Sequence, residues 1–143
     1  MAIPPLNKTN VTAQVDHDSG LIHVVYQEAI TPQVTLQFYE WLYDIAGQYD
    51  LAGIQGATFD FRAVKTFDQG NMRTAQKESR TANNKLSMAH IPVSLIVRTI
   101  YQEQMVRIST KLTQQTQRMK IVKSMDEALV FIQEWNQQHR ATF

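Results

Sequence analysis

The sequence predicts an α/β domain with a mixed, mainly parallel sheet, in the element order β-β-α-β-α-β-α-β-α. From residue 31 onward, short apolar runs alternate with stretches of helical period. This alternation is typical of parallel strands joined by right-handed helical crossovers. Before residue 31, two apolar runs flank a turn-like segment. That pattern predicts an antiparallel hairpin at one edge of the sheet.

The composition is that of a single domain that needs no disulfide or metal for stability. The chain has 143 residues, close to the commonest domain size, and it contains no cysteine. The absence of cysteine excludes disulfides, thiol catalysis and thiolate metal sites. We expect residues 1–10 to form a loosely attached N-terminal leader, because they hold two prolines and no apolar segment. Residues 11–143 are then the single domain.

Charge and hydropathy exclude several classes of protein. The formal net charge is +1, and lysine and arginine form no cluster, which argues against a nucleic-acid-binding protein. No run approaches the roughly 20 apolar residues of a membrane span. The first residues do not resemble a signal peptide. We therefore expect a cytoplasmic protein without a membrane span.

The hairpin and the first helix have clear sequence signals. Residues 11–15 and 21–30 are the predicted strands, and the Asp-His-Asp-Ser-Gly segment between them is typical of a turn. Thr31 and Pro32 open the helix as its N-cap and its first helical residue. Apolar residues then recur at steps of three and four, which predicts a face packed on the sheet. They are Val34, Phe38, Trp41, Leu42, Ile45, Ala46 and Tyr49.

A central strand and a long polar helix follow. We predict the strand at residues 56–64, with Phe59, Phe61 and Ala63 on one face and Asp60 and Arg62 on the other. The helix is predicted over residues 68–89 and is polar nearly all round, so it should pack lightly. Its thin stripe of small or apolar residues consists of Met72, Ala75, Ser79, Ala82 and Leu86.

Two further strands and two helices complete the order. The strands are predicted at residues 91–98 and 118–123. The helix between them should present an apolar face made of Tyr101, Met105, Ile108 and Leu112. Ser124 and Glu127 have the spacing of a capping box at the start of the last helix. That helix is expected to bury Leu129, Phe131 or Ile132, and Trp135.

Three segments resemble the STAS domain family, the sulfate transporter and anti-sigma-factor antagonist domains. They are residues 58–64 (Thr-Phe-Asp-Phe-Arg-Ala-Val), 91–97 (Ile-Pro-Val-Ser-Leu-Ile-Val) and 122–129 (Val-Lys-Ser-Met-Asp-Glu-Ala-Leu). The likeness extends over about residues 11–138 and lies in the pattern of elements. It looks closest to the uncharacterised STAS-like branch related to lipid-binding SEC14-type folds. The resemblance implies a STAS-like fold and a non-catalytic regulatory role through a protein partner.

The resemblance also implies a phosphorylated serine, which this chain lacks. In anti-sigma-factor antagonists that serine lies in an Asp-Ser-Ser-Gly-like segment after the central strand. The matching segment here is residues 68–71 (Asp-Gln-Gly-Asn), and Gln69 has no hydroxyl to accept a phosphate. Thr66 and Thr74 are the nearest hydroxyls, and Thr66 is expected to cap the helix together with Gln69. We therefore expect no phosphorylation switch at this position.

Candidate binding residues gather where the parallel strands end. Ligands bind there in open α/β sheets, because loops and helix N-termini converge at that edge. Cations near the helix N-termini could hold a carboxylate or a phosphate. In the plainer alternative they are solvated loop residues, with Arg62 paired to Asp60 or Asp68. The candidates for binding a partner or ligand are Arg62, Lys65, Thr66, Asp68, Gln69, Gly70, Arg73, Lys77, Arg98 and Thr99, with Lys123 and Ser124 beside the last strand.

No catalytic or cofactor site emerges from the sequence. The four histidines are scattered, without a carboxylate at ligand spacing, and there is no glycine-rich phosphate loop or nucleophile elbow. We therefore expect neither an enzyme nor a cofactor. The leading hypothesis is a regulatory domain whose helix 68–89 binds another protein. The alternative is a SEC14-like protein that binds a small anionic molecule or a lipid, in an apolar cavity of roughly 300 Å³ or more. Whether the chain forms a homodimer stays open.

Overall fold

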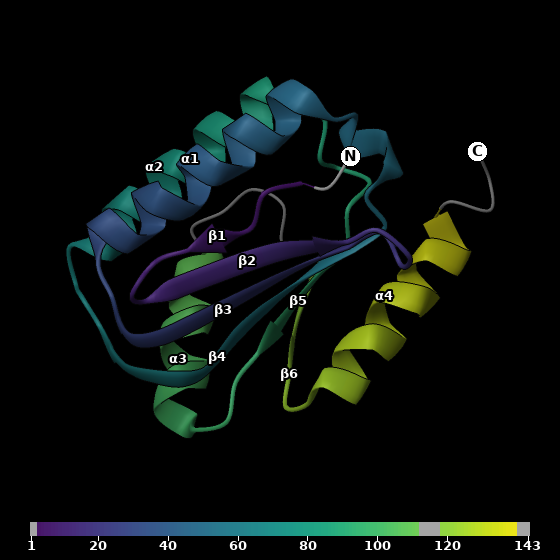
Figure 1. Ribbon diagram of the computed structural model, residues 1–143. Coiled ribbons are helices and arrows are strands. Elements are labelled where there is room, and N and C mark those ends of the chain that lie inside the picture. The colour runs from purple at the N-terminus through teal and green to yellow at the C-terminus, as the bar shows by residue number, and fades with distance from the viewer. Residues whose placement is uncertain (1–2, 112–117, 140–143) are drawn as a thin grey trace.

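Six strands form one sheet in the computed structural model, which describes residues 3–111 and 118–139 (Figure 1). The strands pair in antiparallel fashion from β1 to β3 and in parallel from β3 to β6. This is the mixed, mainly parallel sheet with an N-terminal hairpin that the sequence predicts. The order of the strands across the sheet is their order along the chain: β1 (Leu6–Asn7), β2 (Val11–Asp16), β3 (Leu21–Ile30), β4 (Gly56–Phe67), β5 (Val93–Ile96) and β6 (Met119–Val122).

Of the α-helices in the described residues, three cover one face of the sheet. α1 (Pro32–Gln48), α2 (Asn71–Lys85) and α3 (Ile100–Lys111) connect neighbouring parallel strands. Because each right-handed crossover advances across the sheet in the same direction, all three helices fall on the same side. α4 (Met125–His139) packs on the other face, against β4, β5 and β6 (Figure 1). A short 3-10 turn (Leu51–Gly53) precedes β4.

The N-terminal residues belong to the sheet. β1 pairs with β2, and Leu6 is only 7 % exposed. The indole Nε1–H of Trp41 in α1 donates a hydrogen bond to the carbonyl oxygen of Pro4 at 2.8 Å. The loose attachment expected for residues 1–10 is therefore wrong for the described residues 3–10. Pro4 and Pro5 do not prevent this pairing, because they precede β1 and take no part in its hydrogen-bond ladder.

β4 continues to residue 67, three residues beyond its predicted end. Its pairing with β3 shifts register between Val25 and Gln27 and again between Glu28 and Ala29. Register shifts of this kind bend a strand and redirect its side chains. The polar residues after position 64 resemble a loop in the sequence, and the irregular pairing with β3 is what keeps them in the strand.

An aromatic cluster fills the space between β3, β4 and α1. Tyr26 stacks on Phe61 with ring centroids 5.3 Å apart, and Phe38 of α1 meets Phe59 edge-on at 5.3 Å. Phe61 in turn contacts Phe67 at 6.1 Å. Aromatic pairs of this kind contribute about 0.5–1.5 kcal/mol beyond their burial. Phe59 and Phe61 share one face of β4, as predicted, whereas Ala63, expected on the same face, is exposed.

α2 is shorter than predicted, and its inward side chains are short. It begins three residues later and ends four residues earlier than the sequence suggests, because a turn precedes it. In that turn Asp68 Oδ1 accepts a hydrogen bond from the N–H of Gly70 at 2.8 Å. The helix packs mainly on α1 and less on α3. Its buried residues are Asn71, Ser79 and Ala82.

The residues of α3 that face the sheet are shifted by one position along the sequence from those predicted. Gln102 and Val106 are buried, whereas Tyr101 and Ile108, expected on the apolar inner face, are 44 % and 45 % exposed. The prediction is wrong because a polar residue, Gln102, takes a core position where β4 satisfies its hydrogen bonds.

α4 starts with Ser124 as its predicted cap and buries Ile132 as predicted, but not Leu129. The N–H of Glu127 donates to Ser124 Oγ at 3.1 Å, and the Glu127 carboxylate accepts from the N–H of Lys123 at 3.3 Å. Ala128 and Ile132 are buried. The expected burial of Leu129 is wrong, because the face of α4 that contains Ala128 and Ile132 packs toward the sheet. On that face, Ser94 Oγ of β5 donates a hydrogen bond to the carbonyl oxygen of Ala128 at 2.9 Å.

We predict opposite effects of alanine at two glycines. A Cβ on Gly56 of β4 would lie 2.7 Å from Cγ2 of Ile132 in α4, so Gly56→Ala should destabilise the fold by about 1–3 kcal/mol. A Cβ on Gly47 in α1 would meet no atom within 4 Å, so Gly47→Ala should stabilise it by about 0.5–1 kcal/mol. Urea unfolding followed by circular dichroism measures both. Equal effects would contradict the close approach of α4 to β4.

Candidate functional site

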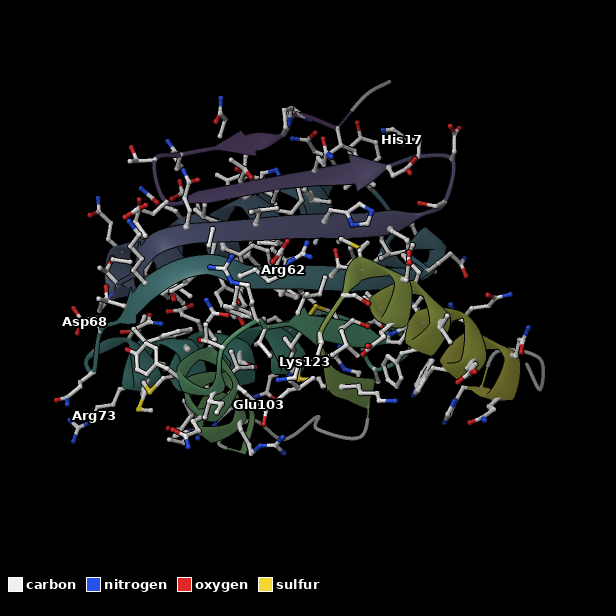
Figure 2. The ribbon with its side chains drawn as sticks, turned by 90° about the horizontal axis from the view of Figure 1, so that it is seen from below. His17, Arg62, Asp68, Arg73, Glu103 and Lys123 are labelled. Carbon is white, nitrogen blue, oxygen red and sulfur yellow. The ribbon has the colours of Figure 1, made fainter. Side chains whose placement is uncertain are left out.

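The structure distributes the candidate residues over separate places (Figure 2). Arg62 lies over the sheet face that α1 and α2 do not cover, whereas Asp68 and Arg73 lie at the end of the sheet where β4 leads into α2. Lys123 points toward Glu103, between the start of α3 and the start of α4. Arg62 and the loop after β4 therefore lie in different places, one over a face of the sheet and the other at its end, and they do not form one site.

Arg62 is held by Asp60, two residues earlier in β4. Its Nε–H donates to Asp60 Oδ1 at 3.0 Å and its Nη2–H donates to Oδ2 at 2.8 Å. Burial alone would raise the pKa of Asp60, but the hydrogen bonds and charge of Arg62 outweigh it and hold that pKa below its ordinary value. The sequence left two interpretations of Arg62, a residue that binds a ligand or partner and a residue paired with a nearby aspartate. The geometry matches the second, with Asp60 as the partner.

The connection from β4 to α2 is a hydrogen-bonded turn. Thr66 lies in β4 opposite Ala29, so its expected role as the cap of the helix is wrong. Gly70 occupies the N-cap position and supplies no side chain. Asp68 holds the turn through its bond to the N–H of Gly70, and its own N–H donates to the carbonyl oxygen of Ile30 at 3.0 Å. The loop is therefore tied to the ends of both β3 and β4.

Two other candidate cations are paired at the surface. Lys65 lies 3.5 Å from Glu28, and Lys123 Nζ donates to Glu103 Oε1 at 2.6 Å. Glu103 also lies 3.6 Å from Arg107. The hydrogen bond and charge of Lys123 are the main causes that lower the pKa of Glu103. Exposed pairs contribute little to stability, but this one joins α3 to the connection between β6 and α4.

The outer side of α2 carries cations without such partners. Arg73 and Lys77 are exposed and form no ion pair with another residue in the described ranges. Arg80 is exposed one turn further along the same face of the helix, since these positions are related as i, i+4 and i+7. We call Arg73, Lys77 and Arg80 the cationic stripe. It begins next to the exposed loop residues Gln69 and Gly70.

Thr99 has a structural role at the start of α3. Its Oγ1 accepts a hydrogen bond from the N–H of Gln102 at 3.0 Å, and Gln102 Oε1 accepts one from the N–H of Thr99 at 3.1 Å. This reciprocal pair is a capping box. Gln102 Oε1 also accepts from the N–H of Arg98 at 2.7 Å. The Thr-x-x-Gln spacing of residues 99–102 is the signal of this box in the sequence.

Gln102 also joins α3 to β4. Its Nε2 donates to the carbonyl oxygens of Arg62 and Val64 at 3.1 Å and 3.0 Å, and the residue is only 2 % exposed. β4 extends beyond the end of β5, so among the described residues only β3 pairs with it there, and the edge toward α3 has no neighbouring strand. The side chain of Gln102 supplies the hydrogen bonds that a neighbouring strand would make.

A cavity of about 190 Å³ lies between the sheet and helices α1 to α3. Its walls are mainly apolar, with Phe38, Phe59 and Leu95 among them. The volume is below the roughly 300 Å³ at which typical ligand pockets begin. The cavity is therefore smaller than the one that a lipid carrier would need.

Residues 3–111 and 118–139 contain no group of three or more His, Asp or Glu side chains that could hold a metal ion. His23, one of the scattered histidines, is hydrogen-bonded through Nδ1 to Thr58 Oγ1 at 2.7 Å. Within the same ranges, no helix has both the length and the apolar character needed to cross a membrane.

This arrangement of sheet and helices is the SpoIIAA-like fold of STAS domains. An uncharacterized protein of the DUF3478 family from Shewanella loihica, described with that fold, has a TM-score of 0.62 and 16 % identity, with 88 % of this chain and 96 % of that one covered. An anti-sigma factor antagonist from Mycobacterium paratuberculosis has a TM-score of 0.58 and 13 % identity, with 86 % and 94 % covered.

A Ser-to-Glu variant of RsbS from Moorella thermoacetica is also similar, with a TM-score of 0.57, 16 % identity, and 96 % and 99 % of the two chains covered. No protein-family model matches the sequence, and no curated protein matches it. At these identities the likeness establishes the fold, and the site has to be argued from this chain's own residues.

We predict that Gln102→Ala lowers the free energy of unfolding by about 2–4 kcal/mol, because it leaves buried N–H and carbonyl groups of two segments unpaired. Gln104→Ala, at an exposed position of the same helix, is the matched control and should change it by less than about 0.5 kcal/mol. Urea unfolding monitored by tryptophan fluorescence measures both. Similar small changes would show that Gln102 does not join α3 to β4.

The Asp60–Arg62 pair predicts a loss of stability in acid. The pKa of Asp60 in the folded protein lies below its ordinary value of 3.8. The ionised carboxylate therefore contributes its full stabilisation at pH values above the ordinary pKa. This contribution disappears as the pH falls through the folded pKa. Asp60→Asn should therefore be less stable than the wild type at about pH 7, and the difference should shrink toward about pH 2. Urea unfolding at both pH values measures it, and a constant difference would contradict the pair.

Proposed function

We propose that this chain is a non-catalytic regulatory domain that binds a protein partner through α2 and the loop before it. The observation that carries the proposal is the exposed cationic stripe, which begins beside residues 68–70 at the end of the parallel strands. The likeness in fold to an anti-sigma factor antagonist supports a regulatory role. The partner is expected to be another protein, in the cytoplasm.

The stripe suits an acidic surface on the partner. Arg73 lies in the first turn of α2, where the positive end of the helix dipole adds to its charge, and Lys77 lies one turn further on. Neither side chain is engaged by a carboxylate among the described residues. Complementary charge of this kind speeds association and disfavours partners of the wrong sign.

The proposed interaction does not depend on phosphorylation of the loop. Gln69 stands where the resemblance implies a phosphorylated serine. The loop is already held by the hydrogen bond between Asp68 and Gly70, so no added charge is needed to order it. Binding at this surface would then be controlled by the amount of partner rather than by a kinase.

The electrostatics of the carboxylates support a non-catalytic role. Asp60 and Glu103 have lowered pKa values, and each is neutralised by a neighbouring cation. Enzymes that use a carboxylic acid for proton transfer usually raise its pKa toward neutrality. The shifts at Asp60 and Glu103 are those of structural ion pairs.

We predict that combining Arg73→Glu with Lys77→Glu weakens capture of the partner by about tenfold or more, because it places like charges against an acidic surface. The tagged protein is isolated gently from its own cells, and native mass spectrometry identifies the partner as an added polypeptide mass. Affinity for the purified partner is then measured for the wild type and the variant, at low and high salt.

The control for this experiment combines Lys8→Glu with Lys120→Glu, which makes the same change in net charge at exposed positions outside α2. It should retain wild-type affinity. Unchanged affinity of the α2 variant, or an equal loss in both variants, would show that the cationic stripe is not the binding surface.

A further inference from the structure

The cavity between the sheet and helices α1 to α3 exists because α2 presents short side chains to it. Ala75 and Ser79 line the cavity from α2, opposite Phe59 of β4 and Leu95 of β5. Since α2 is held mainly by α1 and α3, it needs no large apolar side chains to anchor it on the sheet. About 190 Å³ of space is left beneath it.

One charged residue lines this otherwise mainly apolar cavity. Arg118, directly before β6, is only 7 % exposed. Its Nη1–H donates to the carbonyl oxygen of Ile91 at 2.7 Å, and its Nη2–H makes a long contact of 3.4 Å with Asn83 Oδ1. Its Nε–H has no hydrogen-bond partner among the described residues.

Arg118 also lacks a counter-ion among the described residues. All 13 Asp and Glu residues lie in the described ranges, and none of the ion pairs found there includes Arg118. Burial lowers the pKa of Arg118, yet a guanidinium remains charged near neutral pH. The nearby Tyr39 does not supply a negative charge, because burial raises its pKa to about 12.

A buried cation without a counter-ion is unfavourable unless an anion from outside pairs with it. The donors left on Arg118 are the unpaired Nε–H and the weakly engaged Nη2–H. Arg62 uses the same two nitrogens, Nε and Nη2, to hold the carboxylate of Asp60. This side-on arrangement suits a carboxylate, which accepts two parallel hydrogen bonds.

We propose that the cavity binds a small organic carboxylate with a ring-sized apolar body, whose carboxylate pairs with Arg118. An apolar cavity of about 150 Å³ accommodates benzene, so 190 Å³ holds a body of that size but not a two-chain lipid. A single cation suits one negative charge. Ser79 and Ser109 bring further hydroxyl groups to the lining. The proposal does not rest on the proposed function, because it concerns the inner side of α2.

The test compares benzoate with benzyl alcohol, which has a similar size but no charge. In nitrogen-15 NMR spectra of the full chain, benzoate should shift the Nε–H signal of Arg118 in a saturable way. Its affinity should exceed that of benzyl alcohol by about tenfold or more, because only benzoate pairs with the guanidinium. The Arg118 signal is the one missing from the spectrum of Arg118→Met. Hexanoate and chloride are titrated in the same way.

Three variants locate the site. Arg118→Met should bind benzoate and benzyl alcohol with affinities within about twofold of each other, and it should still fold, since an uncharged side chain of similar length replaces an unpaired buried charge. Ser79→Leu fills the cavity and should abolish binding of both probes. Arg107→Met removes an exposed arginine that does not line the cavity, and it should bind benzoate like the wild type.

The titration of the wild type requires no variant, so a poorly folded variant does not remove the test. Equal affinities of the wild type for benzoate and benzyl alcohol would overturn the proposal, as would undiminished benzoate binding by Arg118→Met. Two other results would also overturn it. In the first, chloride alone shifts the Nε–H signal of Arg118 fully and benzoate causes no further shift. In the second, neither benzoate nor hexanoate causes a saturable shift of that signal.

Discussion

Three right-handed crossovers that advance in one direction place α1, α2 and α3 on the same face of the sheet. α2 is the middle helix of this layer, so α1 and α3 support it from both sides. It can therefore remain polar and present short side chains inward without losing its place. The features of α2 that support the two proposals, its cationic outer side and the cavity beneath it, both follow from this position.

The two sides of α2 can act independently because the helical period separates them. Arg73 and Lys77 point outward, whereas Ala75 and Ser79 line the cavity. The proposed protein partner would meet the charges of the outer side, and the proposed carboxylate ligand would enter the apolar space of the inner side, where Arg118 has an Nε–H without a partner among the described residues. Substitutions on one side can therefore be used as controls for the other.

Much of the fold could be predicted from the sequence, but less of the candidate site. The hairpin, the N-cap at Thr31 and the alternation of strands and helices are local signals, and all appear in the structure. The extension of β4, the capping role of Thr99 and the core position of Gln102 were missed. The core position of Gln102 depends on hydrogen bonds to a strand some 40 residues earlier in the chain. No local pattern contains that information.

The sequence by itself determined the element order, the mainly parallel sheet and the lack of a serine at position 69, because periodicity, caps and residue identity are local properties. Only the tertiary structure decided which charges are paired and which are not. Arg62 pairs with Asp60 within its own strand, whereas Arg118 is buried among residues from α2 and the segment before β5 and forms no ion pair among the described residues. The free energy of a charge depends on every group around it in space, and that neighbourhood exists only once the chain has folded.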